Sequence, residues 1–149
     1  MIINSLDQLN KVSKKIIGKI SNEDCILLYG EIGVGKTTLT RSIINNIQRK
    51  YKIIETEVLS PTFNILYEYE IKNKKIMHYD LYRLKIEKEV FQLGIFDQDF
   101  KCIKIIEWAE LIKKKPSDRL DIYISYSKSK NSRKINFKGH GSWKDFDGI

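Results

Sequence analysis

Runs of apolar residues separated by polar turns indicate the strands of this chain. Residues 25–29 (CILLY) and 102–108 (CIKIIEW) are short and rich in isoleucine and leucine. Runs of this kind are typical of strands that are buried on both faces of a sheet. Two later runs, residues 120–126 and 133–137, are predicted to be the last two strands.

Two extended runs in the middle of the chain predict a β-hairpin. They cover residues 63–71 and 75–80, and the polar residues 72–74 (KNK) join them. A short polar connection between two extended runs is a hairpin signal.

Apolar positions at helical spacing predict two longer helices, one at the N-terminus and one after the first strand. These positions are Leu6, Leu9, Val12 and Ile16 in the first helix and Leu39, Ile43 and Ile47 in the second. The second helix is expected to end at about Lys50. A third, short helix is expected over residues 86–93 and is closed by Gly94.

The order of these elements predicts an α/β fold. Strands and helices alternate in the first part of the chain, and strands dominate in the second. This order favours a mixed, mostly parallel sheet with helices on both faces and one β-hairpin. The length of 149 residues predicts a single domain over residues 1–149.

The first strand runs into a glycine-rich loop, GEIGVGKTT, which begins at Gly30. The residues Gly30 to Thr37 fit the pattern G-x-x-x-x-G-K-[ST] of phosphate-binding loops. Glycines leave the backbone N–H groups open to phosphate oxygens, and the helix that follows directs its positive end at them. In such a loop Lys36 would reach the phosphates and Thr37 would bind Mg²⁺. The sequence therefore predicts a P-loop NTPase fold.

A phosphate loop needs acidic groups for its Mg²⁺, and two carboxylates end predicted strands. Asp80 closes the run IMHYD, and Glu107 lies at the end of CIKIIEW. Ligands of open α/β sheets gather at the carboxyl ends of the strands. Asp80 is a candidate metal ligand, and Glu107 is a candidate for binding the metal or orienting the attacking water. Alternatively, Asp80 caps a turn and Glu107 pairs with a surface lysine.

Charge and composition narrow the choice of partners. The net charge is +8, from 27 basic and 19 acidic residues, which suits either nucleic-acid contact or solubility alone. No apolar run approaches the length of a membrane span, and the N-terminal pattern is helical, so we expect a cytoplasmic protein. Cys25 and Cys102 fall in predicted buried strands, which favours packing over a disulfide or metal site.

Five blocks of the sequence resemble the bacterial TsaE family, also called YjeE. They are GEIGVGKTT, SPTF from Ser60, HYDLYRL from His78, GI from Gly94 and IEW ending at Trp108. The resemblance implies an ATPase that uses ATP and Mg²⁺ and belongs to the machinery making N6-threonylcarbamoyladenosine at adenosine 37 of tRNA. It also implies that the proteins TsaD and TsaB are partners and that they stimulate hydrolysis.

The resemblance also implies roles for individual residues. The nucleotide contacts would be Leu6, Ile32, Gly33, Val34, Gly35, Lys36, Thr37, Thr38 and Thr62. The catalytic residues would be Lys36, Asp80 and Glu107, and the metal ligands Thr37, Asp80 and Glu107. Leu6 would touch the adenine, after a first helix capped by Ser5. Thr62 would lie near the γ-phosphate in a switch-type segment, although residues 60–62 (SPT) also fit a rigid turn.

Other functions stay open at this point. A small P-loop nucleotide or metabolite kinase is the main alternative, although the arginines are not clustered as in a kinase lid. A module that binds ATP only as a switch is a third. Beyond Trp108 only strand character can be aligned with the family. The basic residues there include Lys113, Lys114 and Lys115 and a run of Lys128, Lys130, Arg133, Lys134, Lys138 and Lys144. They fit either a solvated surface or tRNA contact.

Overall fold

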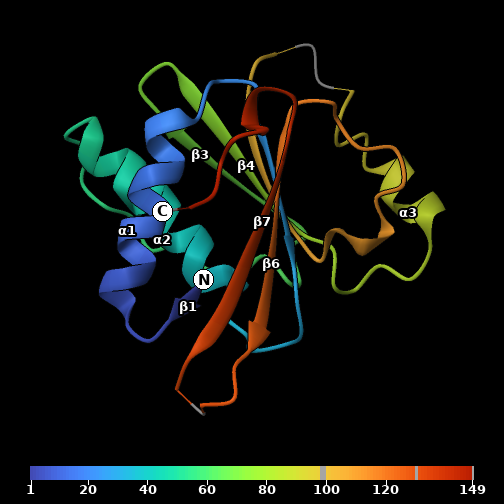
Figure 1. Cartoon of the computed structure of the whole chain (residues 1–149). Helices are drawn as coiled ribbons and strands as arrows, with labels where there is room; N and C mark the ends of the chain where they lie inside the picture. Colours follow the sequence, from blue (N-terminus) through green and yellow to red (C-terminus); the bar gives the residue numbers. More distant parts are fainter. Residues whose placement is uncertain (98–99, 130, 149) are drawn as a thin grey trace.

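The computed structural model describes residues 1–97, 100–129 and 131–148 and contains one seven-stranded sheet (Figure 1). The strands are β1 (Ile2–Ile3), β2 (Cys25–Tyr29), β3 (Leu66–Ile71), β4 (Lys74–Asp80), β5 (Ile103–Glu107), β6 (Arg119–Tyr126) and β7 (Arg133–His140). Their order across the sheet is β1-β7-β6-β2-β5-β4-β3.

Parallel pairing is confined to the centre of the sheet. The pairs β6–β2, β2–β5 and β5–β4 are parallel, whereas β1–β7, β7–β6 and β4–β3 are antiparallel. The predicted mixed sheet is therefore confirmed, and its parallel part comprises the four central strands. Because parallel strands end on the same side, the carboxyl ends of β2, β4 and β5 meet at one edge.

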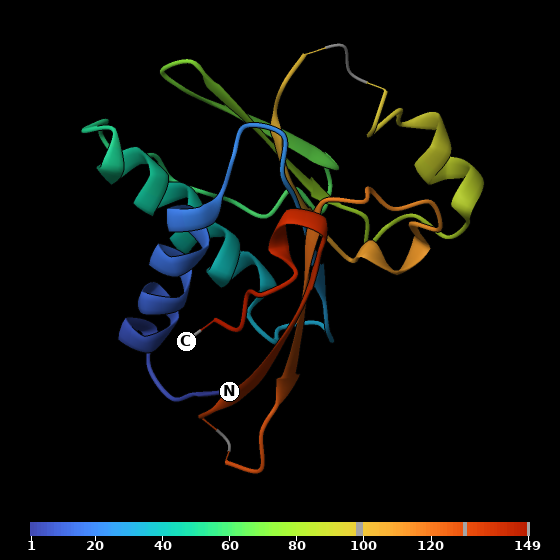
Figure 2. The ribbon, with the colours of Figure 1, turned by 45° about the horizontal axis from the view of Figure 1, so that its top comes forward.

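Helices cover both faces of the sheet, as the sequence predicts (Figure 2). The helices α1 (Leu6–Lys19) and α2 (Lys36–Lys50) lie on one face. The short helix α3 (Glu87–Gln92) and the 3₁₀ turn η1 (Ala109–Leu111) lie on the other. A second 3₁₀ turn, η2 (Gly141–Trp143), packs its tryptophan into the core beneath α1 and α2.

Burial on both faces explains the apolar runs of the central strands. In β2, Ile26 and Leu28 belong to the core under α1 and α2, whereas Leu27 belongs to the core under α3. Cys25 and Cys102 are buried free thiols, so the expected packing role is confirmed. Burial raises the pKa of Cys25 to about 12, which keeps this thiol protonated.

Two parts of the fold differ from the sequence prediction. Residues 61–65 form a turn, and the hairpin strand starts only at Leu66, because Ile65 has a positive φ of 67° and its N–H bonds to the Pro61 carbonyl. The two-residue strand β1 pairs with Arg133 and Lys134 and is too short to leave a pattern in the sequence.

Candidate functional site

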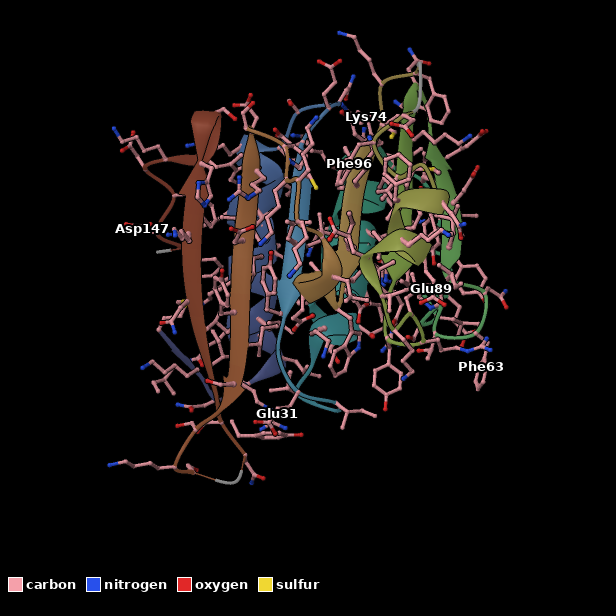
Figure 3. The ribbon with its side chains drawn as sticks, turned by 90° about the vertical axis from the view of Figure 1, so that its right-hand side faces the viewer. Glu31, Phe63, Lys74, Glu89, Phe96 and Asp147 are labelled. Carbon is pink, nitrogen blue, oxygen red and sulfur yellow. The ribbon has the colours of Figure 1, made fainter. Side chains whose placement is uncertain are left out.

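The phosphate-type loop joins β2 to α2 at the edge where the parallel strands end. Gly30 has φ 144°, and a Cβ atom there would lie 2.2 Å from the Ile124 carbonyl oxygen, so only glycine fits. Gly35 caps α2 in the left-handed conformation, with φ 114°. Figure 3 shows that Glu31 in this loop and Phe63 before β3 lie at the same end of the sheet, whereas Lys74 lies at the other end.

Lys36 is the first residue of α2 and is only 4% exposed. Its Nζ donates hydrogen bonds to the carbonyl oxygens of Gly30 at 2.6 Å and Glu31 at 2.8 Å. The same atom lies 3.8 Å from the ring centroid of Trp108, within range of a cation–π contact. Burial lowers the pKa of Lys36, and the nearby Glu107 carboxylate partly offsets this shift. The ammonium group is thus placed inside the loop.

Glu107 ends β5 and is 1% exposed, so it is not a surface residue paired with a lysine. Its Oε2 accepts a hydrogen bond of 2.9 Å from the Thr37 hydroxyl. Its Oε1 lies 2.8 Å from Nε2 of His78, which is also buried. The structure therefore joins the loop threonine and the end of β5 directly.

Asp80 ends β4 and is the register partner of Glu107 on β5. Its Oδ2 accepts hydrogen bonds of 3.0 Å from the hydroxyls of Ser60 and Thr62. Its Oδ1 accepts one of 3.0 Å from the Tyr82 backbone N–H, which caps the turn after β4. Asp80 thus caps this turn, as in one interpretation of the sequence, and also holds the segment that contains Thr62.

These groups surround one cavity of about 240 Å³. Its lining includes Lys36, Thr37, Thr62, Asp80 and Glu107. Hydroxyl and carboxylate oxygens are the ligands that Mg²⁺ prefers, and Mg²⁺ usually takes few protein ligands besides phosphate oxygens and water. The described residues contain no group of three or more His, Cys, Asp or Glu side chains placed to hold a metal. The hydroxyl of Thr37 and the carboxylates of Asp80 and Glu107 nevertheless fit a Mg²⁺ ion whose remaining ligands are phosphate oxygens and water.

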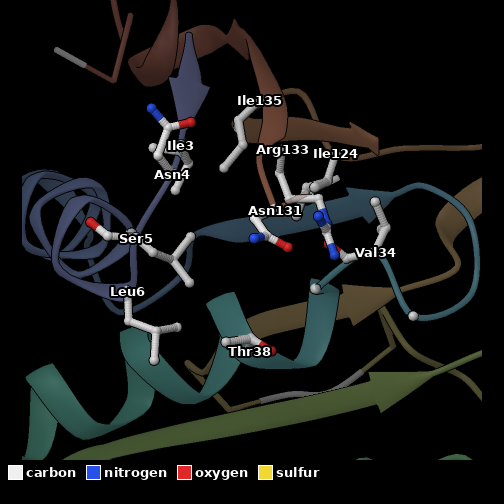
Figure 4. A pocket seen from close by; sticks show the side chains of 13 residues that line it. Ile3, Asn4, Ser5, Leu6, Val34, Thr38, Ile124, Asn131, Arg133 and Ile135 are labelled. Carbon is white, nitrogen blue, oxygen red and sulfur yellow. The ribbon is translucent and has the colours of Figure 1, made fainter. Parts of the chain in front are cut away.

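A second cavity of about 410 Å³ adjoins the first and shares Gly33, Gly35 and Thr38 with it. Leu6 at the start of α1 and Arg133 on β7 lie on different sides of this cavity (Figure 4). Ser5 caps α1, as expected, by accepting a 3.3 Å hydrogen bond from the Gln8 N–H. The larger cavity is lined by apolar side chains such as Leu6 and Ile135 and by polar ones such as Asn131 and Arg133, and the two cavities together form a groove beside the loop.

Arg133 and Tyr126 contact the loop, and sequence analysis did not predict this. The Arg133 Nε donates to the Val34 carbonyl oxygen, and the Tyr126 hydroxyl donates to that of Ile32, both at 3.1 Å. The guanidinium carbon lies 4.6 Å from the centroid of the Tyr126 ring. The sequence places Arg133 only in a basic run, and no local pattern links it to a loop 99 residues away.

Arg83, three residues after Asp80, is not among the residues that line the two cavities. Its Nη1 donates a 3.1 Å hydrogen bond to the Phe63 carbonyl oxygen, and its guanidinium carbon lies 5.5 Å from the centroid of the Phe63 ring. Arg83 thus holds the turn before β3.

A glycine loop between a central strand and a helix, with carboxylates ending two neighbouring parallel strands, defines the P-loop class of α/β proteins. The family model of "Threonylcarbamoyl adenosine biosynthesis protein TsaE" matches residues 3–135. The chain belongs to the TsaE family.

Curated relatives agree with this assignment. The chain is 37% identical to the tRNA threonylcarbamoyladenosine biosynthesis protein TsaE of Rickettsia felis over 113 residues, which is 76% of this chain and 64% of that protein. It is 40% identical to TsaE of Rickettsia conorii over 112 residues, which is 74% of this chain and 61% of that protein. The chain therefore spans less than two thirds of the length of these two relatives.

The Bacillus subtilis proteins extend the comparison. TsaE of this organism is 34% identical over 122 residues, which is 80% of this chain and 72% of that protein. The crystal structure of Bacillus subtilis YdiB superimposes with a TM-score of 0.71 and 25% identity, covering 97% of this chain and 87% of that one.

None of the helices among the described residues has the length and apolar character needed to cross a membrane.

Proposed function

We propose that residues 1–149 form a single ATPase domain that binds ATP with Mg²⁺ and hydrolyses it. We propose further that it acts as the TsaE subunit of the cytoplasmic machinery that makes N6-threonylcarbamoyladenosine at adenosine 37 of tRNA, together with TsaD and TsaB. The observation that carries the proposal is the Thr37–Glu107 hydrogen bond, because it joins the loop to the acidic strand end beside Lys36. Family membership supports the pathway.

Each charged or hydroxyl side chain at the phosphate end of the site has a proposed role. Lys36 offsets phosphate charge from inside the loop, where the backbone from Ile32 to Gly35 forms the cradle. Thr37, Asp80 and Glu107 would hold Mg²⁺, which when bound neutralises charge on the phosphate oxygens. Glu107 would orient the attacking water, and its burial and its contact with His78, which keep the carboxylate in a defined direction, support this role.

The larger cavity would hold the nucleoside. Leu6 offers an apolar side chain, and Thr38 at the first turn of α2 lies where the two cavities meet. A nucleotide whose phosphates enter the loop therefore places its base toward the start of α1. The volume of about 410 Å³ is in the range of ordinary small-molecule sites.

The segment of residues 60–62 is the proposed switch. Ser60 and Thr62 both donate to Asp80, and they also lie within hydrogen-bond distance of each other at 2.8 Å. A change at Asp80 on binding Mg²⁺ would therefore be transmitted to Thr62 and the exposed Phe63 beside it. This link gives partner proteins a route to the site.

The positions of several arginines support hydrolysis that depends on a partner. Arg41 donates to the Val58 carbonyl oxygen, Arg49 pairs with Glu55, and Arg119 pairs with Asp121. Arg83 and Arg133 likewise donate to the carbonyl oxygens of Phe63 and Val34, so each of these arginines already has a partner within the chain. An arginine supplied in trans can raise NTP hydrolysis by about 10³–10⁵. We therefore expect slow hydrolysis by the chain alone and faster hydrolysis with TsaB and TsaD.

One experiment separates the candidate functions. Phosphate release from Mg²⁺-ATP is measured for the purified chain and again with rising concentrations of TsaB–TsaD, and all products are identified. Free phosphate that rises with the partners supports the proposal. A phosphorylated metabolite would instead indicate the small kinase, and ATP binding without turnover would indicate a switch. An unchanged rate with bound partners would exclude activation by TsaB–TsaD.

Contact with tRNA through the basic C-terminal strands is a further part of the proposal. Lys134 and Lys138 are exposed on β7, whereas Lys130 lies outside the described residues. Lys134→Glu with Lys138→Glu should weaken tRNA binding by about tenfold at low salt, because phosphate contacts dominate such binding. The control is Lys14→Glu with Lys15→Glu, which makes the same charge change on α1. If the two double variants weaken tRNA binding equally, the effect comes from the net charge of the protein and not from a specific contact on β7.

A further inference from the structure

His78 is a fully buried polar residue next to the metal-type ligands. It is 0% exposed and lies on β4 two residues before Asp80, so both side chains are on the same face of the strand. Its Nε2 lies 2.8 Å from Oε1 of Glu107. A buried polar side chain is costly unless it is hydrogen-bonded, and this contact provides the bond.

Two side chains contact the carboxylate of Glu107, and only one of them is expected to keep this contact when Mg²⁺ binds. Thr37 donates to Oε2, but the same hydroxyl is a proposed Mg²⁺ ligand and its proton would then be redirected. His78 binds the other oxygen, Oε1, and carries no other proposed role. When Thr37 turns to the metal, the contact with His78 can still fix the carboxylate.

Neighbouring strands fix the position of His78 in the sheet. β4 lies inside the sheet, between β3 and β5. The register partners of His78 are Tyr67 on β3 and Ile105 on β5, so the strand cannot shift without breaking both ladders. The backbone thereby fixes the position of the ring, and the ring fixes the carboxylate.

The hydrogen-bond pattern also defines the tautomer. A carboxylate only accepts, so Nε2 must carry the proton that His78 donates to Glu107. Within the described parts of the chain, Nδ1 is buried and has no hydrogen-bond partner, which suits a bare ring nitrogen better than an N–H group. The contacts of both ring nitrogens therefore lead to the same tautomer, with the proton on Nε2.

We infer that His78 is a positioning residue for Glu107: its Nε2–H holds Oε1 so that Oε2 faces Thr37 and the Mg²⁺ site. This inference rests on the proposed Mg²⁺-ATP function. Groups that orient metal ligands in this way typically change metal affinity or activity by about 10–100-fold when they are removed.

The test uses the Mg²⁺ dependence of nucleotide binding, which needs no turnover. Binding of a fluorescent ATP analogue is titrated with Mg²⁺ for the wild type, His78→Phe and His78→Gln. Phenylalanine keeps the ring but removes the donor, and the Mg²⁺ midpoint should rise about 10–100-fold. Glutamine can place an amide N–H near the position of Nε2, and the midpoint should stay near that of the wild type. Binding in the presence of EDTA should be the same for all three proteins.

Two controls separate positioning from stability. Ile105→Val removes a buried methyl group from the register partner of His78, and it should lower the melting temperature without moving the Mg²⁺ midpoint. His78→Asn keeps an amide but ends near Nδ1, so it should behave like His78→Phe and serves if the phenylalanine variant does not fold. A midpoint that shifts no more in His78→Phe than in Ile105→Val would overturn the inference.

NMR provides a readout that is independent of the metal. A long-range ¹H–¹⁵N spectrum should show His78 protonated at Nε2 and bare at Nδ1, and Glu107→Gln should shift the Nε2 signal. Protonation at Nδ1 instead would overturn the inference even if Mg²⁺-ATP binds. Wild-type protein that binds no nucleotide with Mg²⁺ would refute the proposed function itself, whereas normal wild-type binding with unaffected His78 variants would refute only the role of His78.

Discussion

The two ends of the proposed nucleotide groove are built in different ways. At the phosphate end, Lys36 and Glu107 are buried, and each is held by two hydrogen bonds to the loop or to neighbouring side chains. At the nucleoside end, Leu6 is 72% exposed and stands on the first turn of α1. The segment before it is anchored by the two-residue strand β1 and by the Met1 ammonium, which donates to the Ile135 carbonyl oxygen at 2.7 Å.

This difference predicts where the binding energy for ATP and the chemistry of hydrolysis would be located. The phosphate end consists of strand ends and a loop whose geometry the sheet imposes, so its charged groups are already oriented. The proposed nucleoside end is lined by residues of α1, the loop, β6 and β7, and the apolar side chain of Leu6 there is exposed. We therefore expect large effects from changes at the phosphate end and small ones at the nucleoside end.

The largest effect is expected for Lys36→Ala. The change removes the buried charge that is proposed to face the phosphates, which should cost about 2 kcal/mol or more and weaken ATP binding at least ~30-fold. Isothermal titration with Mg²⁺-ATP and a thermal unfolding curve measure affinity and folding together. Lys50→Ala at the other end of α2 is the matched control, because it removes the same charge from an exposed position. A folded variant with full ATP affinity would refute the phosphate-loop assignment.

Glu107→Gln should separate chemistry from binding at the same end. The amide has the shape of the carboxylate but neither its charge nor its basicity, so hydrolysis should fall by about 10²–10³. ATP affinity at saturating Mg²⁺ should change far less. Phosphate release and ATP binding are measured on the same preparation, with partner proteins present if the chain alone is too slow. Equal losses of both, or no loss of either, would contradict a specific hydrolytic role.

Leu6→Ala tests the nucleoside end and should have a smaller effect. Part of one apolar side chain is lost, which corresponds to about 1 kcal/mol or roughly fivefold in ATP affinity. Ile54→Ala is the control, because Ile54 is exposed and is not among the residues that line either cavity. Binding of tripolyphosphate should be unchanged in Leu6→Ala. A loss as large as that of Lys36→Ala would remove the contrast between the two ends.

Ser5→Ala should have the smallest effect. It deletes the cap of α1 and should lower the free energy of unfolding by about 0.5–1 kcal/mol. Chemical denaturation measures this change, and Ser5→Asp should restore most of it because aspartate is also a good N-cap. A large accompanying loss of ATP affinity would show that the first turn of α1, and not Leu6 alone, forms the nucleoside site.

The amino-acid sequence alone determined the class of fold and the chemistry offered at the phosphate end. The pattern GEIGVGKTT lies within a few residues, and its conformation depends on local dihedral preferences and the neighbouring strand and helix. The carboxylates of Asp80 and Glu107 end apolar runs, so both were predicted to lie at one edge of the sheet. The structure places them as register partners.

Only the tertiary structure decided which groups hold these side chains. Sequence patterns report the period of burial along a segment, but strand order and register bring together residues that are far apart in the chain. His78 reaches Glu107 because β4 lies beside β5, and Arg133 reaches Val34 because β6 pairs with β2 and β7 pairs with β6. Both hydrogen bonds depend on pairing between strands that are far apart in the sequence, and for that reason no local sequence pattern could have revealed them.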